Sequence, residues 1–506
     1  MHIASVFGVC VEKNSELEPA LRKFKGRYVL QGNFVTDEYR EAAVFQSLSS
    51  TPATLEASKM VDAIGLMPGN GIQQADAEQA YAQAEMPASA TKVWLRLPRE
   101  FRPKHFDNFN DPVVVMERAL YGHPDSGGHW EQHCEKSLVS IGWKTIPEWR
   151  SVYWHPELKL VLMVYVDDFK LAGPTGNLEK GWTAIRKVIT FGEDPCDVGR
   201  CLGCHHRVGT KTLEDGTKVR TMQYDMTDFM KSCVSRYVDL AGGPTAVTLK
   251  TVGTPFLADS KSGEEDESQG GNLGKVALQV LMELLYGARV ARYDLLKPVQ
   301  ALAKRVSKWT TQCDQRLHRL MCYVHSTTDV VMEGHVGDTL ENCKLRVFAD
   351  ADFAGDSDAK STSGCFEELN GPHTCFPLLG RSAKQGCTAH CTAEAEVVAL
   401  NAATREVAIP ALAFWDAIGP KGHQMGVELM EDNQATIAIV TTGKNPSLRH
   451  VQRTQKVNIQ WLHDVYQGGI PNCSDRLKLT YVKTGEQKAD IFTKPFTDLT
   501  AWRHAC

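Results

Sequence analysis

The sequence lacks several features that would define a membrane, secreted or fibrous protein. No apolar run approaches the roughly 18 residues that a membrane-spanning helix needs. The N-terminus, MHIASVFGVCVEKNSE, has no basic region ahead of a long apolar stretch, so it does not resemble a secretory signal. The net charge of −5 gives no overall sign of nucleic-acid binding, which depends on local patches. We also find no internal repeat and no coiled-coil heptad array.

The composition indicates an ordinary globular chain with several domains. Its 506 residues are 42% hydrophobic and 23% charged, which favours two to four domains. Fifteen cysteines without a signal peptide favour reduced intracellular thiols over a disulfide framework. The acidic, Ser- and Gly-rich stretch 258–275 predicts a linker that divides the chain. After it, 277–310 has the spacing of a helical pair, and from Lys344 strands alternate with helices as in a compact α/β domain.

The stretch VLMVYVDDFKLAG (161–173) places two adjacent acids between two apolar, β-preferring segments. Neighbouring side chains of a strand point to opposite faces, so Asp167 and Asp168 can converge only at a hairpin tip. Asp76 ends another strand in QQADAEQAYAQAEM, and pairing of these strands would gather three carboxylates suited to hard cations. Alternatively, Asp167 and Asp168 form a solvated turn and Asp76 is a helix N-cap.

Several motifs together resemble a known family. In order and spacing they are similar to the reverse transcriptase of copia-type (Ty1/copia) LTR retrotransposons: DAEQAY (76–81), KVWLRLPREF (92–101), ALYGHPDSGGHW (119–130), LVSIGW (138–143), YVDD (165–168) and RCLGCHHR (200–207). Upstream, VFGVCVEKN and LRKFKGRYVLQGN resemble the fingers hairpin and its basic return strand. The resemblance covers essentially the whole chain.

The second half contains four blocks that resemble the copia-type ribonuclease H: RVFADADFAGDSDAKSTSG (346–364), SAKQGCTAHCTAEAEVVAL (382–400), EDNQATIAI (431–439) and EQKADIFTKP (486–495). Asp350 follows an apolar strand, Glu396 lies on a helix, Asp432 ends a strand, and Asp490 is expected to open the last helix. Acids at neighbouring strand ends and on the adjoining helix can share one edge of a sheet. Taken singly, each is equally well a cap or an exposed charge.

The resemblance implies a multidomain α+β and α/β fold, a right-hand polymerase (fingers, palm, thumb) followed by a ribonuclease H-like α/β domain. The expected boundaries are 1–210 for fingers and palm, 211–257 for a thumb-like segment, 258–275 for the flexible linker, 276–340 for a helical connection and 341–506 for the ribonuclease H-like domain. No CCHC knuckle, protease signature or integrase zinc motif is found. We therefore expect at most the reverse transcriptase and ribonuclease H portion of a Pol polyprotein.

The implied activity is that of an RNA-directed DNA polymerase that also degrades the RNA strand of an RNA–DNA hybrid. Each active site would hold two Mg²⁺ ions, with Mn²⁺ as an alternative, through Asp76, Asp167 and Asp168 in one site and Asp350, Glu396, Asp432 and Asp490 in the other. The implied partners are an RNA template, a DNA primer, the hybrid, deoxynucleoside triphosphates and other Pol or Gag products of the element, with no membrane. The implied location is the cytoplasm, including virus-like particles, with access to the nucleus.

Other positions carry roles that the resemblance implies. Lys25 and Arg27 would contact the incoming triphosphate, and Tyr81 would exclude a ribose 2′-hydroxyl. Backbone phosphates of the hybrid would be gripped by Arg449, His450, Arg453 and Lys456. Each assignment has a structural alternative. Lys25 and Arg27 could form a solvated charged face, and Tyr81 could simply pack. The basic residues of 449–456 could mark the start of a surface helix.

The chain also departs from the family pattern. Asp125 replaces an amide near the expected nucleotide pocket, RTQKVN (453–458) lacks the family's histidine and acid, and Pro410 should kink or end the helix that carries Glu396. These departures leave two rivals open, namely a decayed or domesticated nucleic-acid-binding relic and a nuclease in which only the C-terminal site works.

The stretch PCDVGRCLGCHH contains five residues of metal-binding types, Cys196, Cys201, Cys204, His205 and His206. They suggest a zinc site, or alternatively a palm strand whose side chains simply pack.

Overall fold

The computed structural model describes the chain apart from residues 14–19, 21, 46–49, 258–269, 356–358, 421 and 472. The described residues form two compact units. The first unit comprises Met1–Ala53, Gln73–Leu171 and Gly176–Cys196, and the second comprises Thr54–Ile72, Ala172–Thr175 and Asp197–Cys506. Most of the predicted linker, 258–275, lies outside the described residues, and its last two residues belong to helix α6 (Gly274–Val290).

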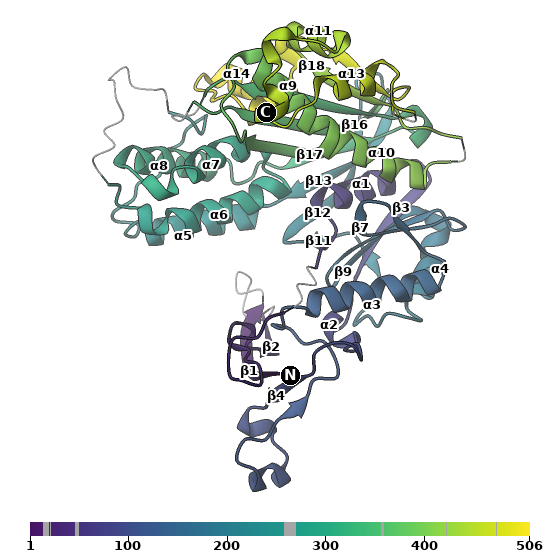
Figure 1. Ribbon diagram of the computed structural model, residues 1–506, viewed down its shortest axis with the longest axis vertical. Helices are drawn as coiled ribbons and strands as arrows, with labels where there is room; N and C mark the ends of the chain where they lie inside the picture. The colour runs from purple at the N-terminus through teal and green to yellow at the C-terminus, as the bar shows by residue number, and fades with distance from the viewer. Residues whose placement is uncertain are drawn as a thin grey trace. The chain divides into compact units, whose positions relative to one another are not determined.

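Two sheets organise the first unit (Figure 1). The smaller has the order β2-β1-β4-β5, with β1 (His2–Lys13), β2 (Lys23–Leu30), β4 (Val93–Arg96) and β5 (Val114–Val115). Its β1 and β2 are antiparallel, as predicted for the fingers hairpin. The larger sheet has the order β10-β3-β9-β8-β7-β6, with β3 (Asn70–Asp76), β6 (Lys144–Ile146), β7 (Trp149–His155), β8 (Leu160–Tyr165), β9 (Asp168–Pro174) and β10 (Cys196–Asp197).

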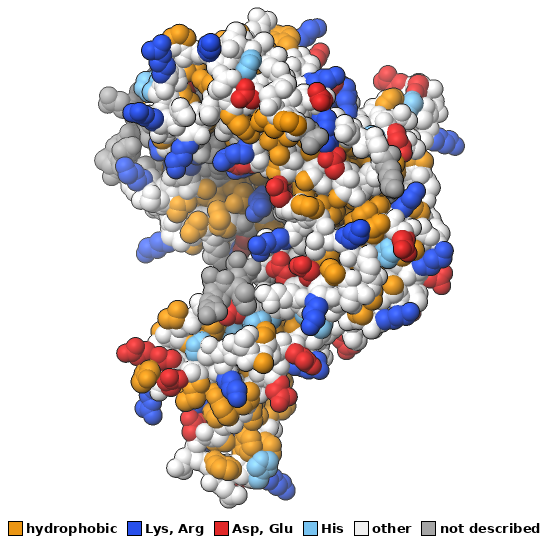
Figure 2. All heavy atoms as spheres, turned by 45° about the vertical axis from the view of Figure 1, so that its right-hand side comes forward, with side chains coloured by type: hydrophobic (Ala, Val, Ile, Leu, Met, Phe, Trp, Pro, Cys, Tyr) orange, Lys and Arg blue, Asp and Glu red, His pale blue; other side chains and the backbone are white. Residues whose placement is uncertain are grey.

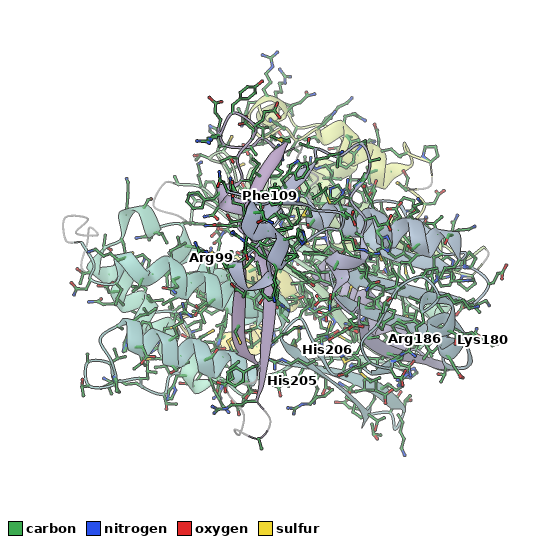
Figure 3. All side chains as sticks on the ribbon, turned by 90° about the horizontal axis from the view of Figure 1, so that it is seen from below. Arg99, Phe109, Lys180, Arg186, His205 and His206 are labelled. Atoms are coloured by element: carbon green, nitrogen blue, oxygen red, sulfur yellow. The ribbon has the colours of Figure 1, made fainter. Side chains whose placement is uncertain are left out.

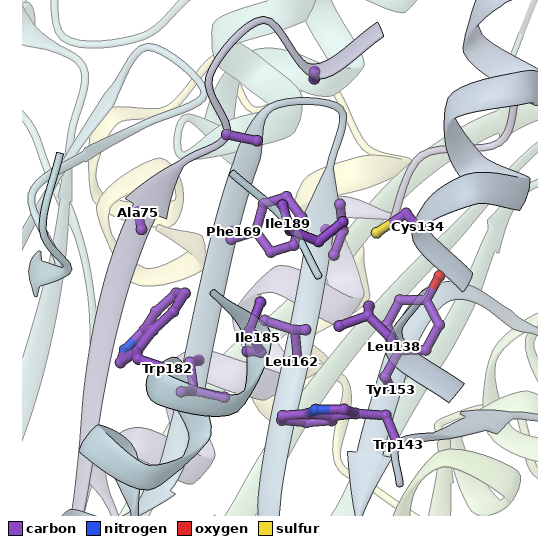
Figure 4. Close-up of a cluster of buried hydrophobic side chains, with 14 of the residues drawn as sticks. Ala75, Cys134, Leu138, Trp143, Tyr153, Leu162, Phe169, Trp182, Ile185 and Ile189 are labelled. Atoms are coloured by element: carbon purple, nitrogen blue, oxygen red, sulfur yellow. The ribbon is translucent and has the colours of Figure 1, made fainter. Parts of the chain in front are cut away.

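A buried apolar cluster fixes the larger sheet (Figure 4). Helices α3 (Ser126–Ser140) and α4 (Thr175–Ile185) supply Trp130, Leu138, Trp182 and Ile185, which pack against Leu160, Leu162, Val164, Phe169 and Leu171 of β8 and β9. Each such side chain contributes about 1.5–3 kcal/mol on full burial. Residues 160–164 are all buried, so β8 is covered on both faces.

The second unit is built on one sheet of the order β11-β12-β13-β14-β17-β16-β15-β18-β19. Its strands are β11 (Arg200–Cys201), β12 (Cys204–Thr212), β13 (Lys218–Asp225), β14 (Met332–Val336), β15 (Lys344–Asp352), β16 (Thr362–Gly371), β17 (Thr374–Lys384), β18 (Val427–Glu431) and β19 (Leu477–Tyr481). Pairing is antiparallel from β11 to β15 and parallel from β15 through β18 to β19.

Helices flank this sheet in two groups (Figure 1). One group lies side by side, α5 (Thr227–Leu240), α6, α7 (Leu296–Ala303) and α8 (Thr311–Ser326), so the helical pair expected at 277–310 corresponds to α6 and α7. The other group lies around β15 to β19 and includes α9 (Thr392–Ala403), α10 (Ile409–Ile418), α11 (Gln434–Thr442), α12 (Val451–Thr454) and α13 (Ile459–Gln467).

The helix that carries Glu396 continues past Pro410. A π-helical turn, Thr404–Ala408, joins α9 to α10, and Ile409 donates its N–H to the Thr404 carbonyl, five residues back. The turn lies ahead of the proline and absorbs the break that a missing N–H would cause, so the helix does not end there as expected. The whole run Thr392–Ile418 is long and apolar enough to span a membrane by composition, but 56% of its window is buried within the protein, as in a core helix.

The fold class agrees with the α+β and α/β multidomain prediction. The division into units differs from the one expected at 258–275, because β11 to β13 precede that stretch and yet join the same sheet as β14 and β17. The boundary expected at residue 211 falls inside β12.

Candidate active sites

The hairpin turn between β8 and β9 holds the paired aspartates of the first unit. Strand β8 ends at Tyr165 and β9 begins at Asp168, so the acids lie at the tip as predicted. Val166 in this turn has φ of 58°, a left-handed conformation that a β-branched residue rarely adopts. The Trp130 indole N–H donates to the Val166 carbonyl at 2.7 Å, and this bond helps to hold the strained turn.

The end of β3 is tied to this turn and brings Asp76 to it. The Ala77 N–H donates to the Asp167 carbonyl at 2.8 Å. The pKa of Asp168 is raised to about 7, chiefly by burial and then by the charges of Asp76 and Asp167 and a hydrogen bond with Asp76. The nearby Lys170 opposes this rise. The three acids therefore interact, although among the described residues their oxygens do not all approach within 4.8 Å of one another.

A cleft of about 730 Å³ opens beside these acids, entirely within the first unit. Its walls include Asp76 and Asp167 together with Lys25 and Arg27 of β2, and also Gly26, Tyr28, Gln74, Ala75, Ala77, Glu78, Gln79, Ala82, Leu120, Tyr121, Gly192, Glu193, Asp194 and Cys196. The volume is in the range of small-molecule sites. Asp125 is not part of this lining; it stands at the N-cap position of α3, where its side chain makes no capping hydrogen bond.

Two tyrosines pack against each other beside this cleft, and Tyr121 is part of its lining. Tyr81 at the start of α2 (Ala80–Gln83) packs against Tyr121 with ring centroids 4.5 Å apart, and the Arg27 guanidinium lies 5.5 Å from the Tyr121 centroid. Burial, and then the charge of Asp167, raises the pKa of both phenols. Tyr121 was not predicted as a site residue, since its motif gives no sign that it contacts Tyr81, forty positions away.

A glycine sets the position of Tyr121. Gly122 has φ of 89°, and a Cβ there would lie 2.0 Å from the Leu30 carbonyl oxygen. The Leu30 N–H in turn donates to the Tyr121 carbonyl at 2.7 Å. Only glycine fits this close approach, which joins the tyrosine to the end of β2.

The second unit gathers three of the four predicted nuclease carboxylates. Asp350 on β15, Glu396 on α9 and Asp432 directly after β18 have oxygens within 4.8 Å of one another. The parallel register pairs Phe348 with Met430, and two residues further along each strand this brings Asp350 level with Asp432. The predicted sheet-edge arrangement therefore arises from strand register and from the packing of α9 on the sheet.

The electrostatics of this triad favour a bound cation. Burial raises the pKa of Glu396 to about 10, and the charges of Glu431, Asp350 and Asp432 add to the rise. Burial likewise raises the pKa of Asp350. The Glu396 Oε2 atom is buried and has no hydrogen-bond partner among the described residues. Crowded, desolvated carboxylates with an open oxygen fit a hard divalent cation, which would relieve their repulsion.

The fourth acid, Asp490, lies in the 3-10 helix Lys488–Phe492 rather than at the start of the last helix, α14 (Leu499–Ala505). The expected helix begins later because the chain makes this short turn first. Lys494 donates to Asp490 at 2.6 Å and lies 3.7 Å from Asp350. Burial, and then the charge of Asp350, raises the pKa of Asp490 to about 7 despite that lysine. Asp490 is thus linked to the triad through Lys494, whose ammonium group lies close to both Asp490 and Asp350.

Sequence reasoning also missed the carboxylate of Glu431. It is fully buried, its Oε1 accepts from the Asn433 N–H at 3.0 Å, and burial raises its pKa well above the usual range. Its position next to Asp432 at the end of a strand was a usable signal. Lys494, in contrast, reaches the site from a turn that the strand and helix patterns do not predict.

The basic residues assigned to hybrid binding lie on and beside α12. Arg449, Arg453 and Lys456 are exposed, while His450 turns toward Glu394. Figure 2 shows Lys and Arg side chains interspersed with Asp and Glu on the face that it presents.

The cysteine and histidine group around β11 and β12 is spread over both faces of a strand. Cys204 and His206 are buried on one face of β12, and the intervening His205 belongs to the other face. Figure 3 labels the two histidines. The buried His206 imidazole lies 3.5 Å from Asp62 and packs edge-on against Tyr224. Among the described residues, this group does not bring three ligand atoms within 4.8 Å, so the zinc site considered above is not formed.

Comparison with known proteins shows which family the chain is similar to. Residues 8–184 match the family model described as reverse transcriptase (RNA-dependent DNA polymerase). The Transposon Ty1-ER2 and Ty1-BR Gag-Pol polyproteins of Saccharomyces cerevisiae are each 23% identical to the chain, over 445 and 435 residues. Each match covers 84% of the chain and 23% of the relative, so the chain spans about a quarter of the length of these curated relatives.

Solved structures give weaker matches. The foamy viral protease-reverse transcriptase in complex with RNA/DNA hybrid is 12% identical with a TM-score of 0.45, covering 95% of this chain and 50% of that one. LC11-RNase H1 is 21% identical with a TM-score of 0.19, covering 30% of this chain and 92% of that one. Neither score reaches 0.5, so the assignment rests on sequence. By its sequence matches the chain is similar to the copia-type LTR retrotransposon Pol proteins, and residues 8–184 match the reverse transcriptase family model.

Proposed function

We propose that this chain is an RNA-directed DNA polymerase of a retrotransposon that copies RNA into DNA and degrades the RNA strand of the resulting hybrid. The observation that carries the proposal is the cleft of the first unit. There, Asp76 and Asp167 face Lys25, Arg27 and Tyr121 across a space of about 730 Å³. Acids opposite basic side chains suit a triphosphate that enters together with cations.

Each residue of the cleft has a distinct proposed task. Asp76 and Asp167 would hold two Mg²⁺ ions, or Mn²⁺, with Asp168 supporting them through its hydrogen bond with Asp76. Two such ions supply charge stabilisation at the attacking and leaving oxygens of an in-line displacement. Lys25 and Arg27 bind the triphosphate oxygens. Tyr81, held by its stack on Tyr121, excludes a ribose 2′-hydroxyl by its bulk.

The nuclease centre of the second unit is proposed to act on the RNA strand of the hybrid. Asp350, Glu396 and Asp432 would hold the divalent cations, with Asp490 at the edge of the group. Lys494 offsets part of the negative charge when no cation is bound. The exposed Arg449, Arg453 and Lys456 would contact backbone phosphates, which makes binding salt-sensitive and sequence-independent.

The proposed partners follow from these tasks. They are an RNA template, a DNA primer, the RNA–DNA hybrid and deoxynucleoside triphosphates, together with other Gag or Pol products of the element. The proposed location is the cytoplasm, including virus-like particles, with access to the nucleus.

The polymerase proposal is tested by primer extension on an RNA template with Mg²⁺ and deoxynucleotides. Asp167→Asn should lower the extension rate at least about a hundredfold, since it removes a charge next to the reacting phosphate. Asp194→Asn is the matched control, because Asp194 lines the same cleft but pairs with Arg186 at 2.6 Å. Equal rates for both variants would contradict the proposal.

A second candidate function, a nuclease without polymerase activity, is favoured by one observation. The nuclease acids meet within 4.8 Å of one another, and the polymerase acids do not. Cleavage of a preformed RNA–DNA hybrid without nucleotides tests it, with Asp432→Asn against the exposed Asp475→Asn as control. Hybrid cleavage that depends on Asp432, without primer extension by the unmodified protein, would establish this second candidate. A protein without either activity would be a folded relic.

A further inference from the structure

Beside the nuclease centre, three residues from two distant segments form a separate cluster. His390 precedes α9, Glu394 lies in its first turn, and His450 directly precedes α12. Their potential ligand atoms all lie within 4.8 Å of one another. The two imidazole rings are 4.8 Å apart and nearly perpendicular, so that both present ring nitrogens toward one carboxylate. The proposed function above gives this cluster no role.

The distances within the cluster match a tetrahedral metal site. Glu394 Oε2 lies 3.2 Å from His390 Nδ1 and 3.2 Å from His450 Nε2. A zinc ion bound at 2.0–2.1 Å by nitrogen and oxygen ligands holds them about 3.3 Å apart. The third spacing, between the two histidines, is at most 4.8 Å. A small rotation of His390, whose side chain is 72% exposed, would close it.

One oxygen of the carboxylate at the centre of the cluster lacks a hydrogen-bond partner among the described residues. Glu394 is fully buried, and its Oε1 atom has no hydrogen-bond partner among the described residues. A buried carboxylate normally pairs with a charge or coordinates a metal, because an unpaired oxygen without water is costly. The two imidazoles and the His390 backbone N–H, at 2.9 Å, all contact Oε2 and leave Oε1 open.

The cluster is distinct from the nuclease triad that uses the same helix. Glu394 and Glu396 are two positions apart, and such residues of a helix do not face each other. The triad consists of carboxylates, which suit Mg²⁺, whereas two imidazoles and one carboxylate suit zinc and similar transition metals.

We propose that His390, Glu394 and His450 bind a transition-metal ion, Zn²⁺ in particular, with a fourth position left to water. The ion would join the segment that precedes α9 to the segment that precedes α12. It would thereby fix the start of the helix that carries Glu396.

The test measures metal binding by the full chain, with Zn²⁺ alone as the probe. Zn²⁺ is titrated against a chromophoric chelator for the unmodified protein, His390→Ala, His450→Ala and His325→Ala. His325 is the matched control, because it is an exposed histidine on α8 outside the cluster. Substitution with Co²⁺ adds an absorption spectrum that separates histidine and carboxylate ligands from the thiolates of the chain's cysteines.

The expected result is one tight Zn²⁺ equivalent that is weakened at least about tenfold in both cluster variants and kept in His325→Ala. Its Co²⁺ spectrum should be tetrahedral, without thiolate-to-cobalt charge transfer. Because His390 is largely exposed, its variant remains informative even if His450→Ala fails to fold. Unchanged Zn²⁺ affinity in His390→Ala, or a thiolate spectrum that persists in it, would overturn the proposal. The imidazoles would then serve only as hydrogen-bond donors to Glu394.

Discussion

At the scale of single residues, the two proposed centres are collections of carboxylates held where their charge is unfavourable. Glu396 has a pKa raised to about 10, and Asp168 and Asp490 have pKa values raised to about 7, in each case chiefly by burial. Ionising these buried carboxylates costs free energy, and a bound divalent cation would offset that cost. It also makes stability depend on pH in a definite direction.

Glu396 should make the metal-free protein less stable as pH rises. Because its pKa is raised in the folded state, from 4.5 to about 10, the folded protein holds more protons than the unfolded chain between these values. Stability is then fully present below about pH 4.5 and is lost progressively toward pH 10. In a chelator, Glu396→Gln should be about 1–3 kcal/mol more stable than the unmodified protein at pH 9 and similar at pH 5, by denaturant unfolding.

Magnesium provides the control for that measurement. At pH 9 it should stabilise the unmodified protein more than Glu396→Gln, because only the former regains a charge partner for this carboxylate. Parallel pH profiles for the two proteins in chelator would contradict the assignment of the pH dependence to Glu396.

Tyr121 should control nucleotide selection through its contact with Tyr81. Tyr121→Ala removes an aromatic ring contact worth about 0.5–1.5 kcal/mol. The Tyr81 ring would then lose the neighbour that fixes its position beside the cleft. We expect the ratio of kcat/KM for a deoxynucleotide to that for a ribonucleotide to fall up to about tenfold. Tyr121→Phe keeps the ring and should keep the ratio. A ratio that falls equally in both variants would show that the hydroxyl, and not the stack, matters.

At the scale of secondary structure, the β8–β9 turn is the element on which the polymerase centre depends. Its strained Val166 is held through the Trp130 indole, which lies in the same buried cluster as Trp143. The two tryptophans differ in one respect. The Trp143 indole N–H is buried without a partner among the described residues, whereas that of Trp130 donates to the turn.

Trp130→Phe should therefore loosen the turn, and Trp143→Phe should not. The first removes the hydrogen bond to the Val166 carbonyl, at a cost of about 0.5–1.5 kcal/mol. The second removes only an unpaired donor, so its loss of stability should be limited to packing. Primer extension should slow in Trp130→Phe while hybrid cleavage stays unchanged. Equal losses of stability and of extension in the two variants would contradict this account of the turn.

The same elements show what the sequence could predict. The hairpin tip at Asp167 and the strand end at Asp76 follow from local patterns, and the structure has them. Asp350 was expected to follow its strand, but β15 continues past it to Asp352. The π-helical turn ahead of Pro410 was not predictable, because a proline alone indicates only a break. Contacts between distant segments, such as Tyr81 with Tyr121 and Glu394 with His450, depend on tertiary packing that no local pattern contains.

At the scale of the whole chain, the two proposed centres lie in different compact units. The acids Asp76, Asp167 and Asp168 belong to the first unit, and Asp350 and Glu396 belong to the second. Each centre takes its acids from a single unit, so a substitution in one centre should inactivate that centre alone. The sheet of the second unit also includes strands from before residue 258, and a division of the chain at that point would cut through it.

The measurement that tests this account most directly follows both products in one reaction. An RNA template and a DNA primer carry different labels, and Mg²⁺ and deoxynucleotides are added to the unmodified protein, Asp167→Asn and Asp432→Asn. The account predicts that Asp167→Asn abolishes primer extension but still shortens the RNA of a preformed hybrid, and that Asp432→Asn does the reverse. Loss of both products in either variant, or extension that survives in Asp167→Asn, would contradict it.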